Sequence, residues 1–400
     1  MQQGFRENVR LDEALEAFFP LFDTVDGETV GLEGATGRVA ASDIVAERDV
    51  PHYDRAAMDG YAVRAADTHG ATDASPVRLD AVERNEQVNR GEAAYVHTGS
   101  AVPDGADAVV RVENTEEVGG SVEVSAATSE GNNVAYAGED VEDGETVVVE
   151  GTRLRPSSIA VLRSVGVEDV DVRQKPRVTV VPTGDEVVRS DPEPGEIVGT
   201  NGPMVADYVR RWGGEATVTD TVPDDEDALR DALRDAAQDS DLVTTTGGSS
   251  VGERDLLPDV VDDLGGMRVH GVAVKPGHPV GFGVVGETPV VTLPGYPVSC
   301  VVNSFEFVRR GVRALLGVDD SPEPTARCRL DGKVASEAGA RTYTRVEIGE
   351  GEDERVARPV RTKGAGVLSS VARADGFVVA PEETEGYASG DEVDVRLWEA

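Results

Sequence analysis

Apolar residues recur at two different spacings along the chain, and each spacing predicts a different kind of element. Near the N-terminus, Leu11, Leu15 and Phe18 share one face at helical spacing, and Pro20 makes the last turn of this predicted helix doubtful. Over residues 30–149 the apolar runs shorten and are separated by Gly, Asp and Asn. This part of the chain predicts a β-rich module of short strands and turns, without a parallel sheet.

From Arg177 onward, apolar strands alternate with amphipathic helices. The run VTVVPTG is β-branched and ends in a glycine turn, and DLVTTTGG and PVVTLPG repeat that pattern. Helical spacing of apolar residues recurs over residues 203–212, with Gly213 as the stop. It recurs again over 228–237 and, after the last of these runs, over 298–316. Strands that alternate with helices in this way predict a central, doubly wound and mostly parallel sheet.

Changes in composition predict the domain boundaries. Residues 319–327 are rich in proline and charge, which is typical of a linker. We expect an N-terminal region over residues 1–175, with a helical and linker part and a β-rich module at about 50–140. An α/β domain follows at 176–320, and a small β domain at 326–400 closes the chain.

The charge balance is strongly acidic, with 76 acidic and 38 basic residues and a net charge of −38. Only four lysines occur, at Lys175, Lys275, Lys333 and Lys363. The acids could serve to bind cations or basic partners, or they could form a halophilic surface whose repulsion is screened by salt. Their even spread along the chain favours the halophilic interpretation. The same balance argues against binding to nucleic acid, which needs a basic surface.

Targeting and cysteine chemistry give little signal. Cys300 and Cys328 form no CxxC pair, so that no zinc or redox motif is visible. The N-terminus has no signal-peptide pattern, and no stretch of about 18 apolar residues exists. We therefore expect a cytoplasmic protein with no membrane segment.

Three loops that follow the predicted parallel strands carry candidate chemistry, because ligands bind beyond the carboxyl ends of such strands. They are PTGDE at 182–186, GGSSVGERD at 247–255 and LPGYP at 293–297. Their glycines and small hydroxyls allow backbone N–H groups to approach a phosphate, although tight structural turns would have the same composition. Asp185, Glu186 and Asp255 could hold Mg²⁺ beside that phosphate, or could be surface acids.

One lysine is informative because lysine is so rare in this chain. Lys275 lies in the rigid turn VKPGHP, where a point positive charge predicts an anion-binding role. His278 follows in the same turn and is either a second positive or hydrogen-bonding group or a structural histidine.

Taken together, the ordered motifs resemble the MoeA family of molybdopterin molybdenumtransferases, which includes the E domain of gephyrin. The motifs are PHYDRAAMDGYAV, HTGS, GED near 140, PTGDEV, TTGGSSVGERD, VKPGHP, LPGYPVS and KGAGVLSS, in this order over nearly the whole chain. The resemblance implies a MogA-like, molybdopterin-binding α/β domain flanked by β-rich domains. It also implies an elongated homodimer, with the active-site cleft between the α/β domain of one subunit and the β-rich second domain of the other.

The implied reaction inserts molybdate into adenylylated molybdopterin with release of AMP and requires Mg²⁺. The residues that match the family's catalytic positions are Asp59, Thr98, Asp140, Glu186, Lys275 and His278. Those implied in binding the pterin substrate are Thr183, Gly184, Thr246, Gly247, Gly248, Ser249, Ser250, Gly252, Pro294, Gly295, Pro297, Ser369 and Ser370. The implied metal ligands are Asp185, Glu186 and Asp255.

Three positions depart from the family pattern. His278 replaces a usual lysine, Ser249 a usual valine, and Tyr296 a common asparagine. Two alternatives to the enzyme stay open: a molybdopterin-binding or scaffold protein without insertion activity, and an enzyme that inserts tungstate. A molybdopterin adenylyltransferase is a further partner that the resemblance suggests.

Overall fold

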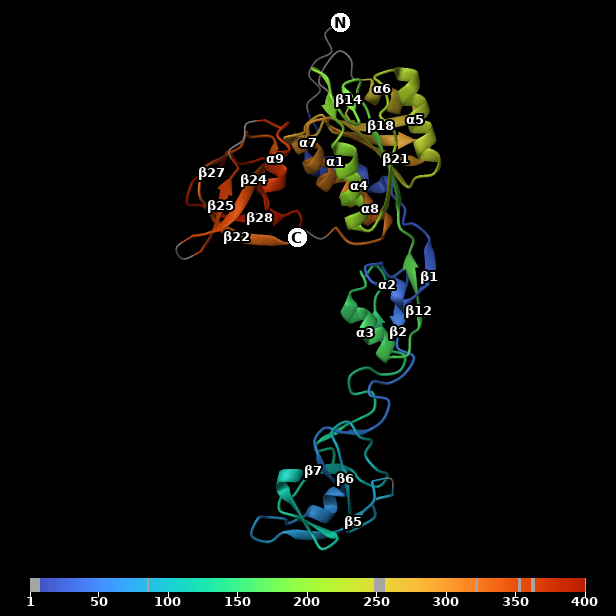
Figure 1. Cartoon of the computed structure of the whole chain (residues 1–400), viewed down its shortest axis with the longest axis vertical. Helices are drawn as coiled ribbons and strands as arrows, with labels where there is room; N and C mark the ends of the chain where they lie inside the picture. Colours follow the sequence, from blue (N-terminus) through green and yellow to red (C-terminus); the bar gives the residue numbers. More distant parts are fainter. Residues whose placement is uncertain are drawn as a thin grey trace. The chain divides into compact units, whose positions relative to one another are not determined.

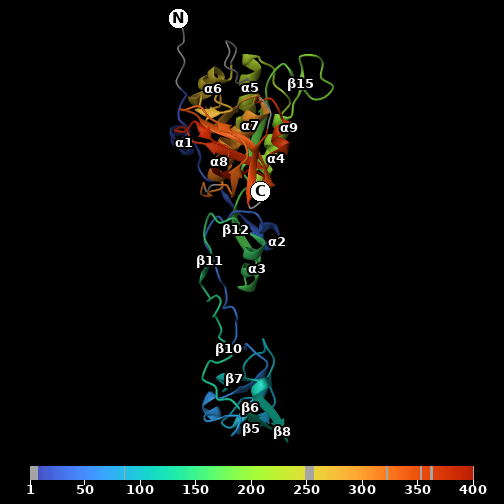
Figure 2. The same ribbon diagram turned by 90° about the vertical axis from the view of Figure 1, so that its left-hand side faces the viewer.

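The computed structural model describes residues 8–84, 86–247, 256–320, 323–351, 354–360 and 364–399. The chain divides into two compact units, Thr29–Val172 and the combination of Met1–Glu28 with Arg173–Ala400. Figures 1 and 2 show the elements of both units. None of the described helices is long and apolar enough to cross a membrane.

A six-stranded sheet forms the centre of the larger unit, in the order β16-β13-β17-β21-β20-β18. The strands are β16 (Glu215–Val218), β13 (Arg177–Pro182), β17 (Leu242–Thr246), β21 (Thr288–Leu293), β20 (Gly281–Val285) and β18 (Gly265–His270). The first four pair in parallel, whereas β20 and β18 add antiparallel strands. The predicted mostly parallel, doubly wound sheet is confirmed.

Helices cover both faces of this sheet, which explains why its strands are apolar on both sides. On one face, α5 (Glu226–Gln238) and α6 (Leu257–Leu264) share a core with Val243 and Val290 of the strands. On the other face lie α1 (Leu11–Phe18), α4 (Asn201–Trp212), α7 (Pro297–Asn303) and α8 (Arg309–Leu315) (Figure 1). Leu242 points to this second face, where it approaches Gly311 of α8.

Helix α1 packs on the α/β domain, although its sequence precedes the β-rich region. The ring of Phe18 lies 5.0 Å from that of Phe282 and 5.4 Å from that of Phe307, centroid to centroid. At Pro20 the helix tightens into the 3₁₀ turn η1 (Phe19–Leu21), because proline has no N–H to continue it. Residues 8–28 therefore belong structurally with the α/β domain, while the domain boundaries drawn from the sequence stay a prediction.

Two helices of the α/β domain each differ in one respect from the sequence prediction. Helix α4 begins two residues before the predicted Pro203 and ends at Trp212, where it is capped by Gly213, whose φ of 106° suits glycine. The predicted helix over 298–316 is continuous but contains the π-helical turn η4 (Ser304–Val308) between α7 and α8. A π turn offsets the helix by one residue, and such turns are often found at functional positions.

The C-terminal β domain is a closed sheet. Its strands are β22 (Thr325–Leu330), β24 (Arg341–Glu350), β25 (Arg355–Pro359), β26 (Gly376–Ala380) and β28 (Glu392–Leu397). They close into a barrel because β26 pairs with both β28 and β24. One further strand, β19 (Val274–Lys275), comes from the α/β domain and pairs in parallel with β24.

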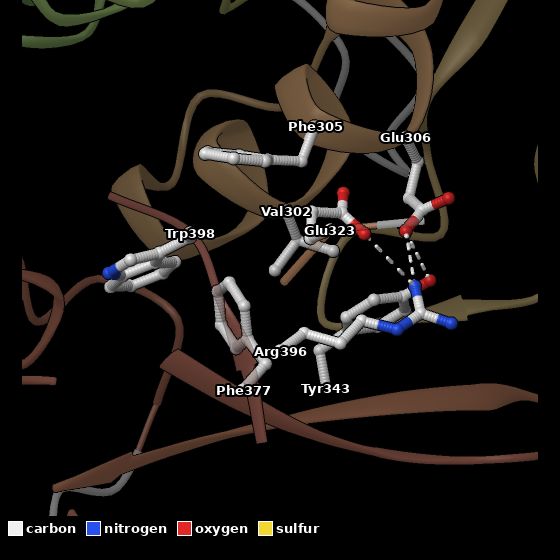
Figure 3. A pocket seen from close by; sticks show the side chains of 8 residues that line it. All are labelled: Val302, Phe305, Glu306, Glu323, Tyr343, Phe377, Arg396 and Trp398. Carbon is white, nitrogen blue, oxygen red and sulfur yellow. Dashed lines mark hydrogen bonds and ion pairs between the residues drawn. The ribbon is translucent and has the colours of Figure 1, made fainter. Parts of the chain in front are cut away.

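A buried polar cluster joins this barrel to the long helix (Figure 3). Glu306, in the π turn, is 2% exposed. Its carboxylate accepts a hydrogen bond from the Tyr343 hydroxyl at 2.7 Å and forms ion pairs with Arg310 at 3.1 Å and Arg396 at 3.5 Å. A buried carboxylate is stable only with such partners, so these contacts fix the register between barrel and helix.

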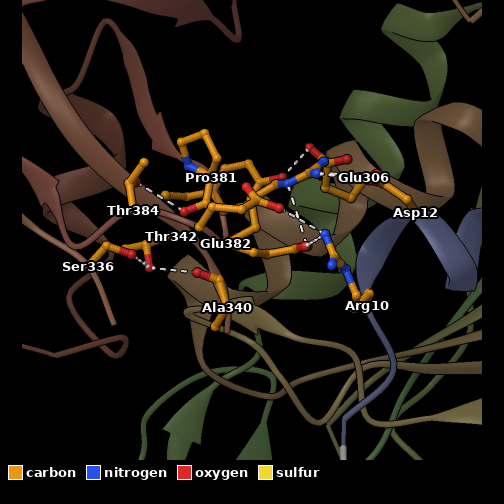
Figure 4. A network of polar contacts seen from close by, with 12 residues as sticks. Arg10, Asp12, Glu306, Ser336, Ala340, Thr342, Pro381, Glu382 and Thr384 are labelled. Carbon is orange, nitrogen blue, oxygen red and sulfur yellow. Dashed lines mark hydrogen bonds and ion pairs between the residues drawn. The ribbon is translucent and has the colours of Figure 1, made fainter. Parts of the chain in front are cut away.

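A second polar network connects the barrel to Arg10 and to helix α1 (Figure 4). The buried carboxylate of Glu382 pairs with Arg10 at 2.7 Å and with Arg341 at 3.9 Å. Arg341 also pairs with Asp12 of α1 at 3.1 Å. Helix α1 is therefore held by the aromatic core on one side and by these ion pairs on the other.

The smaller unit contains a second six-stranded sheet, in the order β7-β4-β6-β5-β9-β8. The strands are β7 (Ala108–Arg111), β4 (Gly60–Val63), β6 (Glu92–Val96), β5 (Val77–Val82), β9 (Ser121–Val124) and β8 (Thr115–Val118). All pairs are antiparallel except β5 with β6. The expected β-rich module is present, and with one parallel pair its sheet is mixed and mainly antiparallel rather than a parallel sheet. A separate small core, which includes Leu154 and Leu162, lies around α2 (Leu32–Ala35) and α3 (Pro156–Ser164).

Candidate functional site

Three predicted loops meet at the carboxyl edge of the central sheet, because β13, β17 and β21 are adjacent and parallel. A Cβ atom built on Gly247 would lie 2.3 Å from the carbonyl oxygen of Thr183, and one on Gly295 would lie 3.4 Å from the Cα of Gly247. Gly247 also has a φ of 116°. Only glycine fits this position, so the close approach of the loops depends on it.

These loops form the wall of a small pocket with a cavity volume of about 60 Å³. Its lining includes the predicted residues Thr183, Glu186, Thr246, Gly247, Gly295 and Pro297. The remaining lining comes from Pro182, from Val187 of β14 (Val187–Val188), from β15 (Ile197–Val198) and from residues 199–202 at the start of α4. A pocket with apolar walls and a few convergent polar groups is typical of a small-molecule site.

Asn201 is a site residue that the sequence interpretation missed. It is the first residue of α4, and its side-chain Nδ2 donates a hydrogen bond to the carbonyl oxygen of Gly295 at 2.7 Å. Gly202 follows, and a Cβ there would lie 3.0 Å from the Pro182 ring. The only signal in the sequence was the polar pair Thr200-Asn201 just before Pro203, which is typical of a helix start.

Asp185 and Glu186 lie exposed at the rim of this edge. Asp185 Oδ1 accepts a hydrogen bond from the backbone N–H of Asp224 at 3.1 Å. The Glu186 carboxylate folds back over Gly184, where an added Cβ would lie 2.9 Å from it. Both side chains offer the hard oxygen donors that Mg²⁺ prefers, and the bare glycine leaves the Glu186 carboxylate room to approach.

The third predicted metal ligand, Asp255, lies outside the described residues, as do Gly248, Ser249, Ser250 and Gly252. Among the residues that are described, no group of three or more His, Cys, Asp or Glu side chains could hold a metal ion. The three-carboxylate magnesium site therefore stays a prediction.

The turn that carries Lys275 is anchored to helix α7. Asn303, fully buried, donates from Nδ2 to the carbonyl oxygen of Gly277 at 3.0 Å and to that of Ser299 at 2.9 Å. A Cβ on Gly277 would lie 2.1 Å from this Nδ2 atom. Asn303 was not predicted, because an asparagine within an apolar helix gives no local sign of its distant partner.

Lys275 itself forms an ion pair with Glu337 of the C-terminal domain. In this structure, the anion that Lys275 binds is the carboxylate of Glu337. Partial desolvation, and then the positive charge of Lys275, lower the pKa of His278 below its ordinary value of 6.5. His278 is therefore neutral at pH 7, which favours hydrogen bonding over the alternative of a second positive charge.

The segment that precedes the predicted Ser369 and Ser370 contacts the start of α7. The backbone N–H of Val298 donates to the carbonyl oxygen of Ala365 at 3.0 Å. Ser369 begins α9 (Ser369–Arg373) and is exposed, whereas Ser370 is buried and its hydroxyl contacts Arg345. Pro294 is buried and is not among the residues that line the pocket.

The predicted residues of the smaller unit form one pair and one separate position. Asp59 Oδ1 accepts hydrogen bonds from the backbone N–H of Thr98 at 2.6 Å and from its hydroxyl at 2.9 Å. These two bonds, the backbone one first, lower the pKa of Asp59. Asp140 lies beside the bridge between Val50 and Val141, with its own N–H bonded to the Val50 carbonyl oxygen. Within the described residues, the Asp59 carboxylate is therefore held by Thr98, and Asp140 is a separate position.

Family models match the chain in three consecutive segments. Residues 9–166 match the MoeA N-terminal region (domain I and II), residues 179–314 a probable molybdopterin binding domain, and residues 327–398 the MoeA C-terminal region (domain IV).

Whole-length relatives carry the same assignment in their names. The molybdopterin molybdenumtransferase 2 of Mycobacterium tuberculosis is 34% identical and aligns with 92% of this chain and 94% of its own length. The molybdopterin molybdenumtransferase of Bacillus subtilis is 31% identical over 98% and 94% of the two chains. The crystal structure of the molybdopterin biosynthesis MoeA protein of Pyrococcus horikoshii superposes with a TM-score of 0.84 at 37% identity, over 98% of this chain and 100% of that one.

Proposed function

Because this chain belongs to the MoeA family of molybdopterin molybdenumtransferases, we propose that it inserts molybdate into adenylylated molybdopterin and releases AMP. The observation that carries this proposal is the pocket in which Thr183, Thr246 and Gly295 converge from three separate motifs. It lies where an α/β sheet binds its ligands.

In the proposed complex, the loops after the parallel strands hold the substrate. Thr183 and Thr246 contribute small side chains, and residues 248–252 would offer backbone N–H groups. The N–H groups of Thr183 and Gly247 already donate to the carbonyl oxygens of Thr246 and Leu293. Asp185 and Glu186, with Asp255, would hold Mg²⁺ beside the substrate phosphates. The ion supplies charge neutralisation and polarises the bond to be broken.

Lys275 is proposed to hold the oxyanion, molybdate or phosphate, through its point charge. Its ion pair with Glu337 supports this role, because a carboxylate presents anionic oxygens like those of the substrate. His278, which is neutral at pH 7, would serve as a hydrogen-bonding neighbour of this group.

Asp59, Thr98 and Asp140 are proposed to act on the substrate from the second subunit of a homodimer. The support is the resemblance to the family together with the short bonds that hold Asp59 ionised and in one orientation. We further propose that the protein works in a cytoplasm of high salt concentration, in keeping with its net charge of −38.

Release of AMP tests this function. The purified protein in molar KCl is given adenylylated molybdopterin, Mg²⁺ and molybdate, and AMP is measured by chromatography. We expect molybdate-dependent release that falls on the order of 100-fold in Glu186→Gln or Asp59→Ala, as for loss of an electrostatic catalytic group. Glu193→Gln is the matched control, since Glu193 is an exposed acid of the same segment whose backbone N–H bonds to the neighbouring Glu196.

Each other outcome points to a named alternative. Tight binding of the pterin substrate without AMP release would replace the enzyme with a binding or scaffold protein. AMP release with tungstate but not molybdate would keep the chemistry and change the metal. An equal loss in Glu193→Gln would mean that the cleft acids act only as part of the acidic surface.

A further inference from the structure

Asn201 lines the pocket and carries a buried hydrogen-bond acceptor. Its Oδ1 atom is inaccessible to solvent and has no hydrogen-bond partner within the described part of the chain, and the residue lines the pocket. The orientation of the amide is fixed, because the Gly295 carbonyl oxygen can only accept and therefore must face Nδ2. Among the described residues, the atom left without a partner is therefore the acceptor, Oδ1.

A second buried polar atom lies in the same wall. The hydroxyl of Thr183, a residue with no exposed surface, also has no hydrogen-bond partner among the described residues. Buried polar groups are nearly always paired in folded proteins, so two such atoms in one pocket indicate that a ligand completes their hydrogen bonds.

The rest of the pocket defines the shape and polarity of that ligand. Apolar walls come from Val187, Ile197 and Pro297. Ile197 is 52% exposed, so part of this apolar wall is open to a ligand. Apolar walls with an acceptor between them suit a flat ring that has N–H groups on its edge. They do not suit a phosphate group, whose oxygens Asn201 Oδ1 would repel.

We propose that Asn201 is a specificity-determining residue, whose Oδ1 accepts a hydrogen bond from the exocyclic amino group of a heteroaromatic ring of the substrate. This inference rests on the proposed function, because adenylylated molybdopterin has two such rings, pterin and adenine. The same side chain also positions the LPGYP loop through Gly295, so that ring recognition and loop placement depend on one amide.

Two pairs of probes identify the ring by exchanging its amino group for a carbonyl oxygen. Pterin is compared with lumazine, and AMP with inosine monophosphate, by calorimetric titration into the full-length protein in molar KCl. In one pair we expect the wild-type protein to bind the amino ring on the order of tenfold more tightly than its oxo analogue, as for one hydrogen bond to a buried acceptor. The pair that shows this preference identifies the ring.

Substitutions then separate recognition from positioning. Asn201→Leu should abolish the preference, so that both members of the pair bind equally. Asn201→Asp keeps an acceptor but loses the donor to Gly295, and it should retain the preference even if both affinities fall. Asn132→Leu, the same change at an asparagine of the smaller unit, should alter neither ratio.

The proposal is overturned if the wild-type protein shows no preference in either pair, or binds none of the four probes. It is also overturned if Asn201→Leu weakens both members of a pair by the same factor, since that result leaves only the positioning role. AMP release by the wild-type protein distinguishes failure of the role of Asn201 from failure of the proposed enzyme activity. If release occurs without ring preference, the role of Asn201 fails and the enzyme stands, whereas absence of release rejects the enzyme itself.

Discussion

At the scale of single residues, the pocket depends on the absence of side-chain atoms at Gly247. The Thr183 carbonyl oxygen occupies the place that a Cβ would take, and the backbone there has a φ of 116°. Glycine is needed for both reasons, and either would exclude another residue.

Gly247→Ala should therefore destabilise the protein more than an alanine that meets only backbone strain. Gly390→Ala is the matched control, because Gly390 has a φ of 94° and an added Cβ there would meet no atom within 4 Å. We expect the control to cost about 1–2 kcal/mol for the left-handed backbone. Gly247→Ala should cost roughly 1–3 kcal/mol more, from overpacking. Urea denaturation at high KCl measures both, and equal losses would contradict the close approach.

The pair of Asp59 and Thr98 predicts a titration shift. Thr98→Val removes the hydroxyl bond and keeps the backbone bond, so the pKa of Asp59 should rise but stay below its ordinary value of 3.8. Carbon-13 NMR of the Asp59 carboxyl group gives both values. The pKa of Asp59 is lower in the folded protein than in the unfolded chain, so ionised Asp59 stabilises the fold. This stabilisation is fully present above the unfolded pKa and is lost as the pH falls through the folded pKa. An unchanged pKa in Thr98→Val would show that the hydroxyl contributes nothing.

His278 provides a second test by pH. Lys275→Met should raise its pKa toward 6.5 by removing the smaller of the two causes of its depression, while desolvation remains. Proton NMR of the imidazole ring follows this change. If the pKa does not move, Lys275 is too far from the ring, or too well screened, to affect it.

The site was only partly predictable from individual residues. Thr183, Gly247 and Gly295 were found because each lies in a loop after an apolar strand, and parallel strands bring their carboxyl ends to one edge. Asn201 and Asn303 were not found, because they act through hydrogen bonds to carbonyl oxygens that lie 94 and 26 positions away along the chain. Such a bond leaves no trace in the local pattern of polar and apolar residues.

At the scale of elements, the long helix holds the C-terminal barrel through its π turn. Burial, and then the charge of Glu306, raise the pKa of Tyr343 well above its ordinary value, so the phenol stays protonated and donates to that carboxylate. The apolar neighbours Phe377 and Trp398 complete the contact (Figure 3).

Tyr343→Phe should lower the free energy of unfolding by about 1.5–3 kcal/mol, the range for a hydrogen bond to a charged group. Tyr387→Phe in the same domain is the control, since its hydroxyl makes only a 3.4 Å contact with the Val379 carbonyl oxygen. We expect a change of less than about 0.5 kcal/mol there. Comparable losses in both variants, measured by urea denaturation, would argue against a special role of the bond to Glu306.

The type of most elements followed from the sequence, but their closure did not. Leu242–Thr246 and Thr288–Leu293 were predicted as strands because continuous β-branched runs are typical of sheets buried on both faces. The barrel closes through the pairing of β26 with β24, and that pairing depends on hydrogen bonds between distant backbones. Any suitable strand could supply them, so composition alone could not assign the partners.

At the scale of the whole molecule, the excess of 76 acidic over 38 basic residues predicts dependence on salt. Thermal stability should rise by several degrees between about 0.1 M and about 1 M KCl, over which the Debye length falls from about 10 Å to about 3 Å. Calorimetry at pH 7 measures the change. Sucrose at matched osmolality is the control, because it stabilises without screening. A melting temperature independent of KCl would contradict the halophilic interpretation.

The strand β19 limits how far the α/β domain and the barrel can be treated as independent modules. Val274 and Lys275 are covalently part of the α/β domain, yet their backbone pairs with Arg341 and Thr342 of the barrel. The barrel therefore acts as the template that holds the backbone of Lys275. If either domain is exchanged for that of a distant homologue, the new domain must supply a strand that pairs with the one that remains. A chimera that joins two relatives at the linker would keep every motif in the sequence and still place the lysine on an unpaired strand edge.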